Sequence, residues 1–241
     1  MQKLKLKAFI IIALLTCRMS NAQNTQHFGL FPTIDHSGTL SNKFDYSLYY
    51  FGEFNLINST NEKPNFFVFY SEQALTYKVN PHLSFTGSYV YERQHPTENN
   101  YRNENRIYLQ ATYKYNLNRT TLKHRIRLDE RFIQDRLANK SPLTSRVRYL
   151  FGISTPLQKQ SDKIYLSAYN EFFFNTFKSA NAIYAENWAY AGVGYNFNKS
   201  NTLEVGILHT FWVGNQTDLT KFFYLQLSWI SHIDWRKKQT K

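Results

Sequence analysis

Apolar and polar residues alternate one by one through most of this chain. In the run from Arg106 to Leu117 the apolar set falls on one face of an extended strand and the polar set on the other. A helix would scatter both sets around its circumference. Comparable runs lie before and after it, at residues 44–57, 66–79, 83–91, 121–133, 143–152, 164–174, 188–197, 203–213 and 222–235. The pattern predicts about ten β-strands, an even number as in bacterial membrane barrels.

The lengths of the runs and of their connections favour a membrane barrel. Each run is close to the 9 to 11 residues, or slightly more, with which a tilted strand crosses a bilayer. Connections alternate between short, as at residues 80–81 and 118–119, and long, as at 94–105 and 134–142. Outer-membrane barrels have short periplasmic turns and long external loops. We expect a transmembrane up-and-down antiparallel β-barrel of about ten strands, or alternatively twelve, with both ends of the chain in the periplasm.

One connection breaks this rhythm. Residues 154–162 should form a periplasmic turn, yet they read as a long loop. The region 176–187 is also expected to be a loop, on the external side. The barrel itself is expected to cover residues 44–235.

The segments before and after the barrel carry their own signals. Residues 1–22 combine three lysines, a short apolar stretch and small residues, which predicts a signal peptide cleaved after Ala22. Cys17, the only cysteine, lies inside it, and a lipid anchor at this residue is an alternative. Residues 23–43 are a periplasmic segment, a plug or an extra strand. Residues 236–241 form a basic tail.

The composition agrees with a barrel that is both apolar and polar. Aromatic residues make up 17% of the chain, whereas mean hydropathy is only −0.52. The net charge is +12, but no basic helix or RNA-binding aromatic signature accompanies it, so we expect no nucleic-acid partner. The aromatic residues are expected to form girdles at the membrane boundaries. They are Tyr46, Tyr50, Tyr89, Tyr91, Tyr113, Tyr115, Trp188, Tyr190, Tyr195, Trp212, Trp229 and Trp235.

Charged residues concentrate on the polar face of two neighbouring runs. A Lys or Arg facing lipid at the bilayer midplane costs about 2–4 kcal/mol, so we expect these residues to face the lumen. The basic stripe comprises Lys123, Arg125, Arg127, Arg131, Arg146 and Arg148. The acidic residues expected on the same inner surface are Asp45, Glu53, Glu72, Glu92, Asp129, Glu171 and Glu204.

The charged lumen allows two interpretations. A network of salt bridges could fill a narrow lumen, because barrels of about eight strands leave room for little more than side chains. Alternatively, an arginine-lined constriction could select anions. We therefore expect an outer-membrane protein of structural or narrow-pore function, with a small anion-selective channel as the alternative. Expected partners are outer-membrane lipid and a small anionic solute, and no cofactor is expected.

Enzymatic chemistry has one candidate pair. His82 and Ser84 share a strand face and resemble the His/Ser pairs of outer-membrane phospholipases and lipid A deacylases. The pair is expected beside a periplasmic turn and toward the lumen, so we expect no enzyme, with a lipid-modifying hydrolase as an alternative. His124, beside the basic stripe, is expected to be structural. The seven histidines show no metal-ligand spacing.

Three segments carry a resemblance to a known family. They are residues 122–132, the hairpin at 80–84 and the tripeptide Asn170-Glu171-Phe172. In these segments the chain resembles the domain of unknown function 2490 family, over roughly Phe44 to Trp235. The resemblance implies a small outer-membrane barrel and implies no established activity.

The last run, with its apolar face ending at Trp235, resembles the final strand that the barrel assembly machinery recognises, which makes that machinery an expected partner. The alternative architecture is a soluble periplasmic barrel of lipocalin type. It would have one closed, apolar core face.

Overall fold

A computed structural model describes residues 24–59, 63–135, 139–177, 183–213 and 219–236. These residues form strands β1 Asn24–Thr39, β2 Phe44–Asn58, β3 Asn65–Lys78, β4 Leu83–Gln94, β5 Arg102–Leu117, β6 Thr120–Ile133, β7 Leu143–Gln158, β8 Ser161–Phe177, β9 Tyr184–Asn196, β10 Asn201–Val213 and β11 Leu219–Asp234. Within these ranges, no helix is long and apolar enough to cross a membrane. The predicted signal peptide lies outside the described residues.

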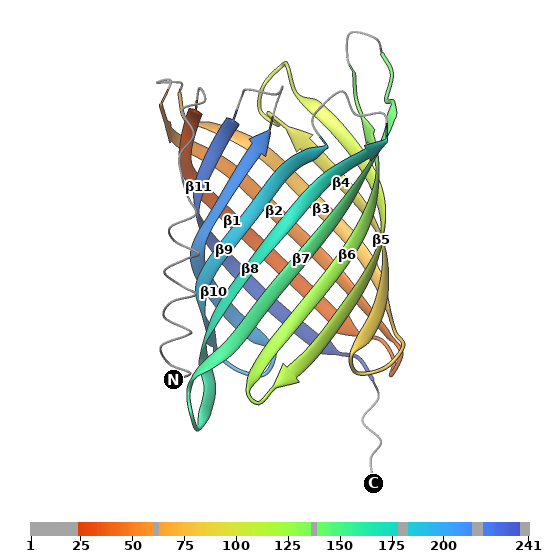
Figure 1. The fold of residues 1–241 in the computed structure, drawn as a ribbon, viewed down its shortest axis with the longest axis vertical. Coiled ribbons are helices and arrows are strands. Elements are labelled where there is room, and N and C mark those ends of the chain that lie inside the picture. The colour runs from red at the N-terminus through yellow and green to blue at the C-terminus, as the bar shows by residue number, and fades with distance from the viewer. Residues whose placement is uncertain (1–23, 60–62, 136–138, 178–182, 214–218, 237–241) are drawn as a thin grey trace.

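The strands form one closed barrel (Figure 1). Each strand pairs antiparallel with the next one along the chain, and β1 closes the barrel by pairing parallel with β11. The predicted β-barrel is thus confirmed, but the described residues form eleven strands, an odd number, where an even number of ten or twelve was expected. One strand pair is parallel, whereas an all-antiparallel barrel was expected. Because consecutive strands alternate in direction, an odd number makes the first and last strands run the same way. Within the segment 23–43, residues 24–39 form the extra strand β1, one of the three forms predicted for this segment.

The odd strand corrects the expected position of the chain ends. We call the side of the barrel with connections 40–43, 79–82, 118–119, 159–160 and 197–200 the turn end, and the opposite side the loop end. β11 finishes at the turn end, whereas β1 starts at the loop end. Asn24 and Arg236, the first and last described residues, therefore lie at opposite ends of the barrel, whereas both chain ends were expected on the same side.

The irregular connection at residues 154–162 is a short turn. β7 continues to Gln158 and β8 begins at Ser161, so the alternation of short and long connections holds around the barrel. Arg119, in the neighbouring turn, donates hydrogen bonds to the carbonyl oxygens of Gln158 (2.5 Å) and Ser161 (3.3 Å). These bonds tie the two turns together, and their partners are backbone atoms that no sequence pattern reveals.

The barrel is apolar outside and polar inside. Its outer surface exposes large apolar side chains, such as Leu109 (66%), Ile126 (53%) and Ile207 (54%). The buried residues of the inner face include many charged ones, such as Arg127 and Asp129. A soluble barrel has the opposite arrangement, because its apolar face is withdrawn from water. The lipocalin-like alternative instead expected one closed, apolar core face.

Gly29 lies at an irregularity in the pairing of β1 with β2 and allows the two backbones to approach closely. The register of the two strands shifts between Phe28 and Gly29, and a Cβ at Gly29 would collide with the carbonyl oxygen of Phe54. Gly29→Ala should therefore lower the free energy of unfolding by about 1–3 kcal/mol, measured by denaturant titration in detergent. Gly87→Ala is the control, because the nearest atom to its Cβ would be a Leu109 methyl at 3.9 Å. Equal losses of unfolding free energy for Gly29→Ala and Gly87→Ala would contradict the close contact between Gly29 and Phe54.

Candidate functional site

The inner faces of the strands enclose a cavity of about 840 Å³. Alternate residues of each strand point into it, because successive side chains of a strand leave on opposite faces. The cavity is lined by acidic, basic, hydroxyl and aromatic side chains from every strand. A solute that binds to the barrel or passes through it would have to occupy this space.

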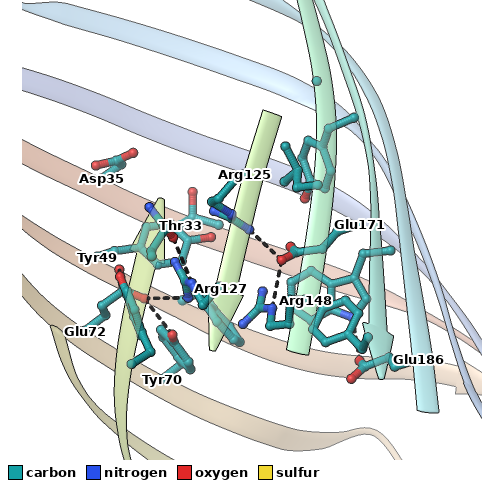
Figure 2. A pocket seen from close by; sticks show the side chains of 18 of the residues that line it. Thr33, Asp35, Tyr49, Tyr70, Glu72, Arg125, Arg127, Arg148, Glu171 and Glu186 are labelled. Carbon is teal, nitrogen blue, oxygen red and sulfur yellow. Dashed lines mark hydrogen bonds and ion pairs between the residues drawn. The ribbon is translucent and has the colours of Figure 1, made fainter. Parts of the chain in front are cut away.

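Glu171 of β8 joins two arginines of the basic stripe. Its Oε1 accepts hydrogen bonds from Arg125 at 2.6 Å and from Arg148 at 2.8 Å. Figure 2 shows both guanidinium groups pointing at this one carboxylate. Arg148 also lies 3.8 Å from Asp129, which links the group to the next part of the network.

Asp129 and Glu186 bind the guanidinium of Arg146 between them. Arg146 donates to Asp129 at 2.8 Å and lies 3.5 Å from Glu186. The indole N–H groups of Trp188 and Trp212 both donate to Glu186 Oε1 at 2.5 Å. The carboxylate of Glu186 therefore lies between a cation and two neutral donors.

Two further groups complete the network. Glu104 pairs with Arg106 at 2.5 Å and with Arg131 at 2.7 Å, and Arg106 reaches Glu92 at 3.1 Å. Glu72 of β3 pairs with Arg127 of β6 at 3.4 Å. It also accepts hydrogen bonds from the hydroxyl groups of Tyr70 (2.7 Å) and Tyr108 (2.5 Å), and Figure 2 shows part of this group. Across the described residues, every arginine in this network has a carboxylate partner.

Aromatic side chains fill the other side of the lumen. The ring of Trp188 on β9 packs 5.7 Å from that of Phe31 on β1 and 6.2 Å from that of Phe51 on β2. Four neighbouring strand pairs separate β9 from β2 around this side of the barrel, so these contacts cross the lumen. Trp188 also packs 5.6 Å from Phe173 on β8.

Two rings join the aromatic side to the charged side. Phe173 packs against Trp188 and lies under the guanidinium groups of Arg148 (4.3 Å) and Arg146 (4.8 Å). Tyr70 stacks on Phe51 at 4.3 Å and donates to Glu72. The side chains that meet here form what we call the septum: Phe31, Phe51, Tyr70, Glu72, Tyr108, Arg127, Arg148, Glu171, Phe173 and Trp188. All of them except Trp188 are buried, and all of them except Phe31 line the cavity.

The structure places all six residues of the predicted basic stripe along the cavity. Five of them have carboxylate partners. Lys123 is half-buried toward the turn end and makes no ion pair among the described residues. The stripe is therefore a set of paired charges, except at its first residue.

The acidic residues divide into two groups. Four of the predicted ones belong to the network, namely Glu72, Glu92, Asp129 and Glu171. The others lie apart: Asp45 pairs with Lys78 at 2.6 Å, Glu53 accepts a hydrogen bond from Tyr224 at 3.2 Å, and Glu204 is buried in the cavity wall.

Three network residues were missing from the predicted site. Glu104 and Glu186 fall in stretches that the sequence indicated to be loops, although β5 and β9 begin before them. Arg106 was assigned to the polar face of its strand but not to the charged site. The period of two, followed back from Tyr108 through Arg106 to Glu104, would have found two of the three.

His82 and His124, the two histidines considered as functional candidates, both lie within hydrogen-bond distance of neighbouring residues. His82 Nδ1 lies 3.0 Å from the carbonyl oxygen of Lys114, and within the described residues no hydrogen bond joins His82 to Ser84. His124 Nδ1 lies 2.9 Å from the Tyr149 hydroxyl. No group of three or more His, Cys, Asp or Glu residues in the described ranges could hold a metal ion.

The predicted aromatic girdle is only partly right. Trp229 and Trp235 are exposed at the turn end, as expected of a girdle. Trp188, Tyr190 and Trp212 instead belong to the inner cluster, where the two indoles bind Glu186. Aromatic rings lie on both the inner and the outer surface of this barrel. The position of each residue along its strand decides which of the two surfaces its ring faces.

These features define a closed β-barrel with a charged and aromatic interior and an apolar exterior. The chain belongs to the family described as protein of unknown function (DUF2490), whose family model matches residues 34–220. The family suggested by the three sequence segments is thereby confirmed.

No curated protein matches the chain. Among solved structures, the chain is similar to an anion-selective porin from Comamonas acidovorans, with 13% identity and a TM-score of 0.35. The match covers 77% of this chain and 52% of the porin, so the chain spans about half the length of that protein.

Proposed function

We propose that this protein is an outer-membrane β-barrel whose lumen is closed by the septum, so that its role is structural and it passes no solute in this state. The observation that carries the proposal is the pairing of the lumen arginines with buried carboxylates. An anion-selective constriction needs cations whose charge is available to the passing ion. Here Arg125, Arg127 and Arg148 are held by Glu171 and Glu72.

The outer surface supports the membrane location. Apolar side chains on the outside of a barrel are stabilised by lipid and disfavoured by water. Exposed Leu75 on β3, Phe151 on β7 and Ile207 on β10 lie on strands that are spread around the ring, so the apolar surface surrounds the barrel. The barrel assembly machinery remains the expected partner for insertion.

The closed lumen can be tested by electrical recording. Purified protein in a planar lipid bilayer should give no current steps above the baseline, because the septum blocks the lumen. The double variant Phe173→Ala/Trp188→Ala removes the rings that bridge β8, β9, β1 and β2, and it should give resolved steps.

The control for this experiment is Trp229→Ala, which removes an exposed indole from the outer surface and should leave the bilayer silent. Regular steps from the unaltered protein would contradict the closed lumen. Steps from Trp229→Ala would show that the current does not report on the septum.

A further inference from the structure

A serine, a histidine and a tyrosine meet on the outer surface near the turn end. Ser231 of β11 and His36 of β1 are register partners across the parallel pair, and Tyr46 lies near the start of β2. Ser231 Oγ lies 2.8 Å from His36 Nδ1, and the Tyr46 hydroxyl lies 2.9 Å from His36 Nε2. All three are partly exposed.

These residues face outward, toward the lipid in the proposed membrane. Along β1 the exposed side chains Phe28 and Ile34 share the parity of His36. Along β11 the exposed side chains Trp229 and Ile233 share the parity of Ser231. Successive strand residues alternate between faces, so the cluster lies outside the lumen and away from the septum.

The surrounding chain is shaped to hold Tyr46 in place. Its ring lies across Gly38, where any Cβ would collide with it, so only glycine allows this approach. The indole N–H of Trp235 donates to the Tyr46 oxygen at 3.1 Å. A hydroxyl that accepts from Trp235 can also accept from His36 Nε2–H, which leaves His36 Nδ1 to accept the proton of Ser231.

This is the arrangement of a nucleophile, a base and a group that orients the base. We infer that Ser231, His36 and Tyr46 hydrolyse a carboxylic ester of a membrane lipid. The inference rests on the proposed membrane location. Ser231 Oγ attacks the ester carbonyl carbon as its proton moves to His36 Nδ1. The C–O bond to the lipid alcohol then breaks, and that oxygen takes the proton from His36. Water attacks the acyl-serine by the same route and releases the fatty acid.

The position of the cluster indicates a glycerophospholipid of the leaflet at the turn end. Exposed Ile34 (52%) and Trp235 (59%) give the acyl chain an apolar surface beside the cluster. Arg236 follows Trp235 directly, and it donates to Asn42 at 3.0 Å and to Asp234 at 2.8 Å. That guanidinium is paired with the Asp234 carboxylate, so its charge is not free for a headgroup, and the membrane position alone indicates a glycerophospholipid.

The first test is labelling of folded protein with a fluorophosphonate in detergent micelles. The adduct should map to Ser231 by peptide mass spectrometry. The matched control is Ser37, which faces inward and lies 3.0 Å from His232 Nδ1 across the same pair of strands. Labelling of Ser37, or of neither serine, would overturn the inference.

The second test is release of fatty acid from mixed micelles of detergent and phosphatidylethanolamine. Ser231→Ala should abolish release, and His36→Asn should lower its rate by about 10²–10⁴-fold. Ser37→Ala should match the unaltered protein. Heat-modifiable migration on gels confirms that each variant is folded. Release that survives in folded Ser231→Ala overturns the inference, and so does its absence from the unaltered protein.

Failure here is distinguishable from failure of the proposed function. Labelling and release depend on the outer surface at the turn end, whereas the bilayer recording depends on the septum. A silent bilayer together with inactive micelles would overturn the inference and leave the closed barrel standing.

Discussion

Glu171→Gln should lower the free energy of unfolding by about 3–5 kcal/mol, because the change removes the carboxylate that pairs with buried Arg148 and half-buried Arg125. Glu171 is 2% exposed and accepts hydrogen bonds from Arg125 and Arg148. Glutamine keeps the shape and one carbonyl oxygen, so the change removes the charge with little loss of packing. The measurement is equilibrium unfolding by denaturant in lipid vesicles.

The control is Glu130→Gln on the neighbouring sheet surface. Glu130 is exposed on the outer side and accepts a hydrogen bond from Ser145 at 2.8 Å. Its change should stay within about 0.5 kcal/mol, as surface substitutions usually do. If Glu171→Gln were as mild as the control, the lumen would be hydrated and the septum would not close it.

Leu109→Arg should lower the free energy of unfolding in vesicles by about 2–4 kcal/mol, because it places a guanidinium in the middle of the bilayer. Leu109 lies in the middle of β5, is 66% exposed and pairs in register with Gly87 and Leu128. In a water-soluble barrel the same change on an exposed residue would have little effect. The variant therefore tests the membrane location.

Leu117→Arg is the matched control for this prediction. Leu117 is the last residue of β5, is 62% exposed and lies at the turn end. Near the membrane boundary an arginine should cost only about 0–1 kcal/mol. Equal losses for the two variants, or no loss for either, would contradict a bilayer around the middle of β5.

Strand β1 shows why the sequence left the barrel incomplete. Its stretch contains Gly29, Pro32 and Gly38, residues that weaken strands and lower confidence in a strand pattern. The barrel tolerates them because Gly29 fits a bulge against Phe54 and Gly38 accommodates the ring of Tyr46. Both explanations depend on how β2 pairs with β1, which the residue pattern of β1 alone does not show. The sequence therefore left three forms open for residues 23–43.

The candidate sites were predictable to different degrees. The inward direction of the basic stripe from Lys123 to Arg148 follows from the period of two and the cost of charge in lipid. Its pairing does not, because Arg127 meets Glu72 three strands away and Arg146 meets Glu186 two strands away. The Ser231 and His36 pair was beyond reach, because one partner lies on β1 and no pattern indicates a parallel closure.

The sequence by itself determined the barrel, its apolar outside and its charged inside, because the alternation of residues is local and each strand carries it alone. Only the tertiary structure decided how the barrel closes and which charges meet across it. Strand number, tilt and register are linked through closure, so each contact depends on the whole ring of strands. That closure joins β1 to β11 in parallel, fills the lumen with the septum and brings Ser231 to His36 on the outer surface.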